Sequence, residues 1–310
     1  MKLSKRLLEL TLIVVGLAAC GGGGGSDGGG GNNPPLPPTT VDNVNINNPT
    51  LVTADNDAVS PGDALTLVWR DEFNAAQLDP ESWFFEAGDG SQYGNPGWGN
   101  TELQWYLPNS AQLENDSLVI TARNEVSNGK NYTSARLHTR DRFAFRYGRV
   151  EARIRLPAGQ GIWPAFWLLP QDNVYGRWAA SGEIDIMEAV NLGVAGNNTV
   201  HGTIHYGGAT PGNLYSGGEY LVPMDATSNF HEYAIEWDPT EIRWYVDDVL
   251  YSMKDAWSST GADYPAPFDQ HFYILLNVAV GGNWPGSPDA STVFPETMEV
   301  DYVRVYSGEP

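Results

Sequence analysis

Hydrophobic and polar residues alternate with a period of two in several short segments, and this alternation predicts β-strands. In the clearest segment, 149–156, apolar side chains alternate with charged ones: Val150, Ala152, Ile154 and Leu156 against Arg149, Glu151, Arg153 and Arg155. Similar β-prone segments span 117–122, 233–237, 242–246 and 300–305, and 246–249 predicts a tight hairpin. We find no long amphipathic helical pattern. The class we expect is all-β, with two packed antiparallel sheets.

The first sixty residues show a different pattern. Three basic residues precede the short apolar stretch 7–16, which is followed by Leu17, Ala18, Ala19 and Cys20. This resembles a bacterial lipoprotein signal, so we predict a signal peptide over 1–19 and lipidation of Cys20. The alternative, an ordinary secretory peptide, is weaker because Leu17 stands where a small residue is wanted. A Gly-rich and then Pro/Asn-rich linker over 20–60 would precede a catalytic domain over 61–310.

The cysteine count, the residues after Cys20 and the net charge indicate where the protein is located in the cell and which partners it can bind. Because Cys20 is the single cysteine, the exported chain would have no disulfide. Gly21 and Gly22 provide no acidic retention signal, so we expect an anchor in the outer membrane or at the cell surface, or otherwise a secreted protein. The formal net charge of −21 disfavours nucleic acid and polyanionic partners. We expect a monomer that touches the membrane only through its lipid anchor and binds a neutral partner.

Three carboxylates occur within the short apolar segment Glu183–Glu188. A carboxylate is costly to bury unless it is paired or used. On a strand, Glu183 and Asp185 face the same side, while strict alternation puts Met187 rather than Glu188 beside them. One extra residue near Met187, a β-bulge, would return Glu188 to their side. Bulges are frequent next to active sites, so the spacing predicts a bulged catalytic strand.

With the bulge, the Cα atoms of Glu183 and Glu188 are about four strand steps apart, or ~13 Å. If the side chains lean together, their carboxyls come within roughly 5–6 Å. That separation suits retaining glycoside hydrolysis better than the inverting mechanism, which needs ~6.5–9.5 Å. Two alternatives are a solvated strand face and a Ca²⁺ site. The flanking isoleucines argue against the first, and the linear arrangement on a strand argues against the second.

Several aromatic residues are candidates for stacking on sugar rings. On a strand, Trp163 and Trp167 share one face, and Phe166 takes the other and belongs to the core. Most tryptophans of a β-protein are core residues. For Trp98, Trp163, Trp167 and Trp284, and for Trp163 above all, we nevertheless favour contact with substrate, because they lie next to glycine or proline in loops or beside the motifs that carry the family resemblance given below.

The segment Glu183–Glu188 resembles the signature of glycoside hydrolase family 16, specifically the laminarinase (endo-β-1,3-glucanase) branch. The family's lichenase branch lacks the extra Met187. The resemblance extends over about 65–306 and includes five further segments: Trp98–Tyr106, Tyr147–Ile154, Gly161–Leu169, His201–Gly207 and Asn277–Gly286, with Asp301–Tyr306 at the end. In combination these motifs are highly specific.

The resemblance implies a β-jelly-roll of two curved antiparallel sheets with a concave substrate cleft. It implies Glu183 as nucleophile, Glu188 as acid/base and Asp185 as the assisting carboxylate. Asn100 and Glu102 resemble ligands of sugar hydroxyls, and His205 resembles a cleft-lining histidine near the acid/base. His201 is interpreted as structural, and a zinc site is disfavoured because no third ligand is evident. No cofactor is implied for catalysis, although Asp301 and the Glu72 carbonyl match a structural Ca²⁺ site.

We therefore predict a retaining endo-β-1,3-glucanase that acts on laminarin-like β-glucans by double displacement. One alternative is the same chemistry on mixed-linkage β-glucan or an algal galactan. Another is a non-catalytic β-glucan-binding module, although such relatives typically lose the acids that this chain keeps. Transglycosylation is also compatible with the sequence.

Overall fold

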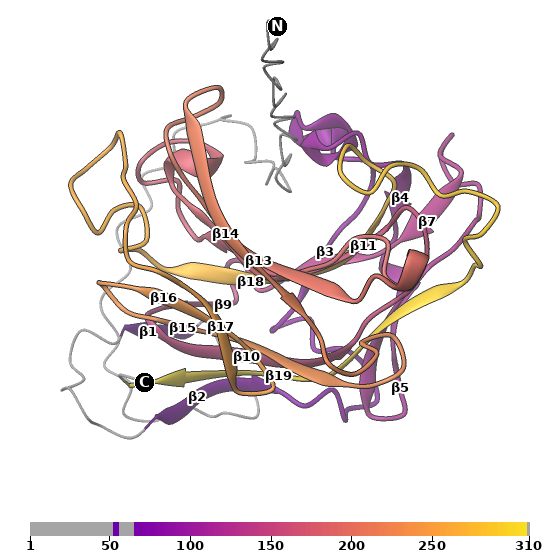
Figure 1. The fold of residues 1–310 in the computed structure, drawn as a ribbon, viewed down its shortest axis with the longest axis horizontal. Coiled ribbons are helices and arrows are strands. Elements are labelled where there is room, and N and C mark those ends of the chain that lie inside the picture. Colours follow the sequence, from indigo (N-terminus) through magenta and orange to yellow (C-terminus); the bar gives the residue numbers. More distant parts are fainter. Residues whose placement is uncertain (1–51, 56–64, 309–310) are drawn as a thin grey trace, which may run out of the picture.

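The computed structural model describes residues 52–55 and 65–308. Two large β-sheets pack face to face, and the upper one curves upward at both ends (Figure 1). The predicted all-β class and jelly-roll architecture are confirmed. The predicted signal peptide, Cys20 and all of the linker except 52–55 lie outside the described residues.

The upper sheet has nine strands and carries the carboxylate segment. Seven strands follow one another in the order β1, β9, β18, β11, β12, β13 and β14, and β8 pairs with β18 and with β3. Their bounds are β1 Val52–Asp55, β3 Phe84–Glu86, β8 Arg136–His138, β9 Phe143–Arg146, β11 Ile162–Pro170, β12 Glu183–Glu188, β13 Thr199–Gly207, β14 Asn213–Leu221 and β18 Phe272–Val280.

The lower sheet has eight strands in the order β17, β16, β15, β10, β19, β6 and β5, with β2 beside β19. Their bounds are β2 Thr66–Asp71, β5 Ala111–Glu114, β6 Ser117–Ala122, β10 Gly148–Arg155, β15 His231–Trp237, β16 Ile242–Val246, β17 Val249–Lys254 and β19 Glu296–Ser307. All five predicted strand segments fall in this sheet. In the predicted hairpin, Asp247 and Asp248 both adopt positive φ, as a two-residue turn of type I′ requires.

The remaining elements are short. A third sheet pairs β4 Gln104–Tyr106 with β7 Tyr132–Ser134. Five 3₁₀ turns complete the described ranges: η1 Ser91–Tyr93, η2 Pro96–Gly99, η3 Pro108–Ser110, η4 Trp178–Ala180 and η5 Val194–Gly196. None of the helices in these ranges has the length and apolar character required to cross a membrane.

The main hydrophobic core fills the space between the two large sheets. Alternate residues of the facing strands point into it except where a bulge interrupts the alternation, and they include Ile184 of β12, Ile204 of β13 and Phe166 of β11. A second apolar cluster lies on the other face of the nine-stranded sheet and contains Trp163 and Trp167, with Trp284 packed against it. The predicted division of β11 into a Trp face and a Phe166 face is confirmed.

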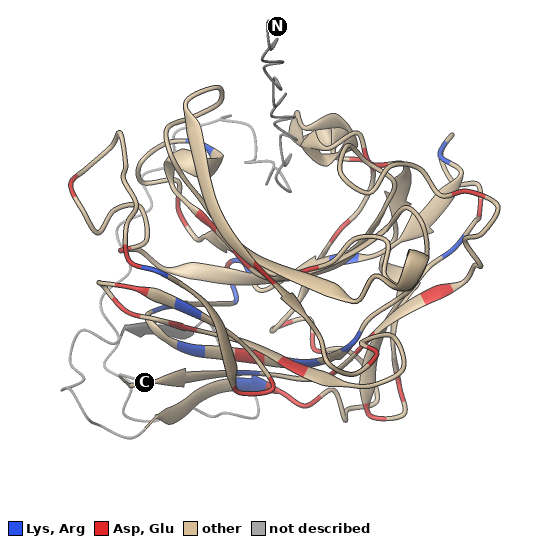
Figure 2. Cartoon of the chain, in the orientation of Figure 1, with Lys and Arg blue, Asp and Glu red and all other residues tan. Residues whose placement is uncertain are grey.

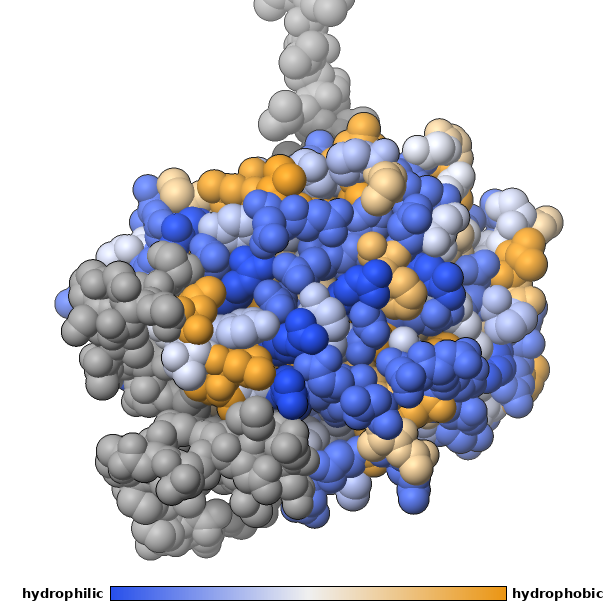
Figure 3. Space-filling model, turned by 90° about the horizontal axis from the view of Figure 1, so that it is seen from below, coloured by the Kyte–Doolittle hydropathy of each residue, from blue (hydrophilic) through white to orange (hydrophobic). Residues whose placement is uncertain are grey.

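The outer face of the eight-stranded sheet is charged. Arginines and acidic residues alternate on adjacent strands there, and Figure 2 shows blue and red segments side by side. The largest group surrounds Arg149, which contacts the carboxylates of Glu151, Glu232, Glu236 and Asp248 within 3.3 Å. The molecule seen from below is mainly hydrophilic, with separate apolar patches (Figure 3). This face therefore meets water, and the opposite, curved sheet carries the site.

Candidate active site

The predicted β-bulge is present in β12 and brings its three carboxylates to one face. Between Asp185 and Glu188 the chain advances three residues, while its partner β13 advances two: Glu183 pairs with His205, Asp185 with Thr203 and Glu188 with His201. The pairing of β12 with β11 shows the same shift of register. The isoleucines and Met187 of β12 enter the main core. The carboxylates consequently face away from that core, on the side of the second apolar cluster.

A hydrogen bond from the other sheet reaches the bulged strand through the core. The indole of Trp244, on β16, donates to the backbone carbonyl of Asp185 at 2.8 Å. Gly202 makes room for this indole, because a Cβ there would lie 2.3 Å from Trp244 Cδ1. Gly202 has no unusual φ, so the requirement is for space. This hydrogen bond connects β12, at its bulge, to the eight-stranded sheet and so favours the observed register.

The entry to β12 also depends on a glycine. Gly182 has φ +89°, and a Cβ there would lie 2.9 Å from the Phe268 ring. Both the left-handed conformation and the close packing favour glycine. This turn places Glu183 at the start of the strand.

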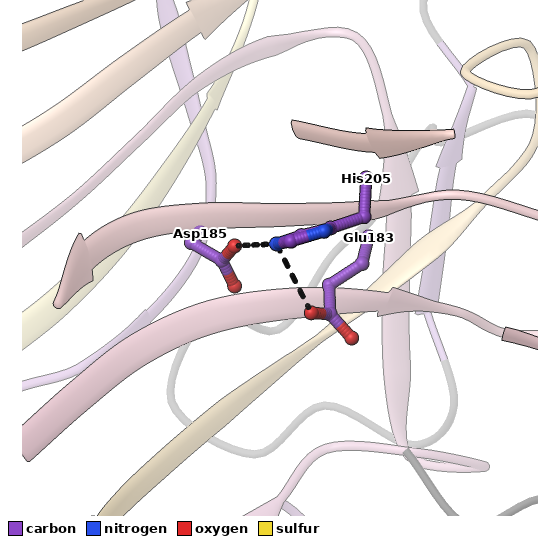
Figure 4. A group of neighbouring side chains, drawn as sticks. All are labelled: Glu183, Asp185 and His205. Carbon is purple, nitrogen blue, oxygen red and sulfur yellow. Dashed lines mark ion pairs between the residues drawn. The ribbon is translucent and has the colours of Figure 1, made fainter. Parts of the chain in front are cut away.

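Glu183 and Asp185 are buried together with His205 (Figure 4). The His205 Nε2 atom lies 3.2 Å from Asp185 Oδ2 and 3.9 Å from Glu183 Oε1. Burial, and then the charges of Asp185 and Glu188, raise the pKa of Glu183 well above its usual range. Burial also raises the pKa of Asp185. Burial lowers the pKa of His205 to about 4, so the imidazole is neutral near pH 7. Close carboxylates of this kind share protons rather than all ionising.

Trp178 is a functional candidate that sequence reasoning missed. Its indole donates to Glu183 Oε2 at 3.1 Å, and its ring centroid lies 5.9 Å from that of His205. Trp178 has φ +51°, which is strained for a large residue. Such strain is found at functional sites, and here it aims the indole at the carboxylate. A tryptophan five residues before Glu183, between Gly176 and Gly182, was the available signal.

Glu188, at the other end of β12, also has a tryptophan as its hydrogen-bond donor. Trp163 donates its indole N–H to Glu188 Oε1 at 3.0 Å. Trp284 meets Trp163 edge-on with ring centroids 5.4 Å apart, and His201 meets Trp284 at 5.0 Å. Trp163 is fully buried, whereas Trp284 is partly exposed. His205 pairs in register with Glu183 and His201 with Glu188. The Glu188 charge still acts on His205, where it opposes the lowering of the pKa by burial, and the expected place of His205 near the acid/base stays a prediction.

Asn100 and Glu102 belong to a buried polar network. Glu102 accepts hydrogen bonds from Gln104 at 2.6 Å, from the Tyr106 hydroxyl at 3.2 Å and from Asn100 at 3.4 Å. Burial raises the pKa of Glu102 to about 7, although these donors and Arg136 oppose the rise. The Asn100 Oδ1 atom is buried without a hydrogen-bond partner in the described structure. The predicted contacts of Asn100 and Glu102 with sugar hydroxyls stay predictions.

Arg136 lies between two of the predicted tryptophans. Its guanidinium is 4.5 Å from the Trp98 ring and 4.8 Å from the Trp167 ring, and it pairs with Glu86. The positive charge lowers the pKa of Glu183 and so opposes the effect of burial. Trp98 and Trp167 are both fully buried, and their predicted contact with substrate stays a prediction. The structure adds that they hold a cation close to the carboxylates.

Two groups of residues bear on metal binding. In the described chain, Glu183, Asp185 and His205 offer ligand atoms within 4.8 Å of one another. The residues named for a structural Ca²⁺ site lie on the adjacent strands β2 and β19 or directly beyond them. There the Glu72 carboxylate accepts two hydrogen bonds from Arg304 at 2.8 Å, and Asp301 pairs with Arg153 at 2.5 Å. Asp301 would therefore have to leave Arg153 to bind Ca²⁺, whereas the Arg304 contacts engage the Glu72 side chain and not the backbone carbonyl named for the site.

The curved β-sandwich and its carboxylate strand define a jelly-roll glycoside hydrolase. Residues 99–304 match the family described as Glycosyl hydrolases family 16, and the chain belongs to that family. Catalysis in this family needs no cofactor.

Two curated relatives share close to half of their aligned residues with this chain. A glucan endo-1,3-beta-glucosidase A1 from Niallia circulans is 44% identical over 262 residues, which are 78% of this chain and 38% of that protein. A beta-glucanase from Rhodothermus marinus is 45% identical over 255 residues, 77% of this chain and 84% of that protein. The laminarinase catalytic domain of Thermotoga maritima, a solved structure, is 42% identical, with a TM-score of 0.72 over 80% of this chain and 100% of that chain.

The Trp178 hydrogen bond predicts a shift in the pH profile of activity. In Trp178→Phe, Glu183 loses a donor that lowers its pKa, so the pKa of Glu183 rises further. As the predicted nucleophile, Glu183 must be ionised to react, so we expect the acidic limb of kcat/KM to move up by roughly 1 pH unit, with activity partly recovered at higher pH. The matched control is Trp257→Phe, which removes an indole donor to the Pro265 carbonyl and should leave the limb in place. A uniform loss of activity at every pH would contradict this role for Trp178.

Proposed function

We propose that this protein is a retaining endo-β-1,3-glucanase that hydrolyses laminarin-like glucans. The observation that carries the proposal is the bulge that sets Glu183, Asp185 and Glu188 on one face of β12. A pair of carboxylates in unlike environments is what double displacement at a glycosidic bond requires. The names of the relatives, a glucan endo-1,3-beta-glucosidase and a laminarinase, support β-1,3-glucan as the substrate.

In the proposed mechanism, Glu183 attacks the anomeric carbon while Glu188 protonates the leaving oxygen. Glu188 then removes a proton from water, which releases the sugar from Glu183 with the original anomeric configuration. The Trp178 indole orients the Glu183 carboxylate by donating a hydrogen bond to it, and the Trp163 indole does the same for Glu188. Burial raises the pKa of both Glu183 and Asp185, so the two neighbouring carboxyl groups titrate as a pair and need not both be charged at once.

Mixed-linkage β-glucan is the second candidate substrate, because one close relative is named only beta-glucanase. We propose a product analysis on laminarin, lichenan, agarose and carrageenan. Cleavage of laminarin supports the β-1,3-glucanase. Cleavage of lichenan alone supports the mixed-linkage activity, and activity on a galactan alone contradicts both. Binding of laminarin without any turnover supports a non-catalytic module, and elongated products reveal transglycosylation.

Replacement of the nucleophile tests the mechanism directly. Glu183→Gln should lose hydrolysis by at least roughly 10³-fold, while folding and glucan binding persist, because the amide keeps the shape and cannot attack. The matched control is Glu114→Gln on β5, an exposed position that should hydrolyse as the wild type does. NMR of the first-formed product gives the anomer independently. An active Glu183→Gln enzyme would overturn the nucleophile assignment, and an inverted product would overturn double displacement.

We also propose a structural Ca²⁺ ion at Asp301 and the Glu72 carbonyl, on the strength of the family resemblance. Binding requires Asp301 to leave Arg153, so the gain must exceed the loss of that ion pair. With Ca²⁺ at about 100 times its dissociation constant, unfolding should shift up by roughly 5–10 °C relative to excess EDTA. Asp301→Asn should abolish this increment. Identical unfolding temperatures of the wild type in Ca²⁺ and in EDTA would refute the site.

For location we propose an exported lipoprotein anchored through Cys20 to the outer membrane or cell surface. The basic, apolar and small-residue succession before Cys20 supports this assignment. In a bacterial host, the wild type should sediment with membranes, whereas Cys20→Ala should not become lipidated. Equal release of both forms into the soluble exported fraction would favour ordinary secretion.

A further inference from the structure

The catalytic residues are part of three rows that cross β12, β13 and β14. Strand pairing puts three residues side by side in each row, all on the carboxylate face: Glu183, His205 and Tyr215; Asp185, Thr203 and Gly217; Glu188, His201 and Glu219. Directly paired residues of neighbouring strands point to the same side of a sheet. The two outer rows therefore carry large side chains, and the middle row carries progressively smaller ones.

The middle row descends toward the edge of the sheet. It begins at buried Asp185, continues through Thr203 at 6% exposure and ends at Gly217, which has no side chain and is exposed. Gly217 does not adopt a left-handed φ, so its backbone conformation does not require glycine. A Cβ there would lie 2.8 Å from Thr203 Oγ1 and 3.0 Å from the Gly202 carbonyl oxygen. Because Gly217 has no side chain, the space above the backbone stays free at the solvent-exposed end of the row.

The outer rows end in two residues suited to sugar binding. Tyr215 is 43% exposed, and its ring centroid lies 6.0 Å from that of His205. Trp178, His205 and Tyr215 thus follow one another as a row of aromatic rings from Glu183 to the sheet edge. On the opposite side, Glu219 is exposed and pairs in register with His201. β14 is the last strand of this sheet (Figure 1), and Tyr215 and Glu219 are both exposed on it.

The direction of the rows matches the direction in which a glycan must run. A sugar that reacts between Glu183 and Glu188 lies over β12, with Glu183 on one side of it and Glu188 on the other, both in the direction of the strand. Its neighbours in the glycan then extend across the strands, over the middle row. From β12 to β14 the distance is about 10 Å, two strand spacings.

We propose that Tyr215, Gly217 and Glu219 form an outer sugar subsite for the glycan chain at the β14 edge. Gly217 is the floor, Tyr215 stacks on the apolar face of the sugar, and Glu219 accepts hydrogen bonds from its hydroxyls. This inference rests on the proposed glucanase function and deepens it. It assigns a specificity role to an edge strand that carries none of the catalytic carboxylates.

The test compares Tyr215→Ala with the wild type on a series of β-1,3-gluco-oligosaccharides of increasing length. Loss of the aromatic platform should lower kcat/KM by roughly 3- to 10-fold on chains long enough to reach β14, with short chains cleaved at the wild-type rate. Tyr215→Phe should restore the long-chain rate, because it keeps the ring. Glu219→Gln should give a smaller loss with the same length dependence.

Leu214→Ala is the matched control, since Leu214 is an exposed neighbour on the same strand whose side chain points to the opposite face. It should leave the whole length series unchanged. A Tyr215→Ala enzyme that loses activity equally on all lengths, or on none, would overturn the subsite. If the wild type does not cleave β-1,3-glucans, the proposed function fails. The length series is then made from the glycan that it does cleave, so the two failures are separable.

Discussion

The site depends on the register of β12, and one hydrogen bond across the core ties that register to the rest of the fold. The Trp244 indole, from the eight-stranded sheet, reaches the Asp185 carbonyl at the bulge. A one-residue slip in a strand moves every side chain to the other face. Slippage here would put acids into an apolar core, which costs far more than a surface rearrangement. The bulged register is therefore favoured both by the core and by the Trp244 contact.

The same arrangement has a cost in folding free energy, because it buries the carboxylates of β12. Three carboxylates are buried on one strand, and burial raises the pKa of Glu183 and Asp185. The donors that offset this cost are the indoles of Trp178 and Trp163, with the Arg136 charge at longer range. Each donor also fixes the direction of a carboxylate. Stability and function consequently depend on the same few contacts, and the strained Trp178 is one of them.

Much of the fold followed from local patterns. The alternation over 149–156 and the segments 117–122 and 242–246 correspond to β10, β6 and β16. The spacing of Glu183, Asp185 and Glu188 predicted the bulge, because a period of two leaves only one way to bring the third acid back. The aromatic face of β11 was predictable for the same reason. In contrast, local patterns did not predict that Arg153 pairs with Asp301 or that Arg304 pairs with Glu72, because these contacts depend on strand pairing across the sheet.

The sequence by itself determined the β class, the carboxylate face and the family, since each depends on residues close together along the chain. Only the tertiary structure decided which distant side chains meet those carboxylates. Trp244 approaches from another sheet, Arg136 comes from β8, and Tyr215 reaches the catalytic row through two successive strand pairings. Periodicity assigns a side chain to a face of its own strand. It does not say which strand lies beside it, because pairing is set by how the whole core packs.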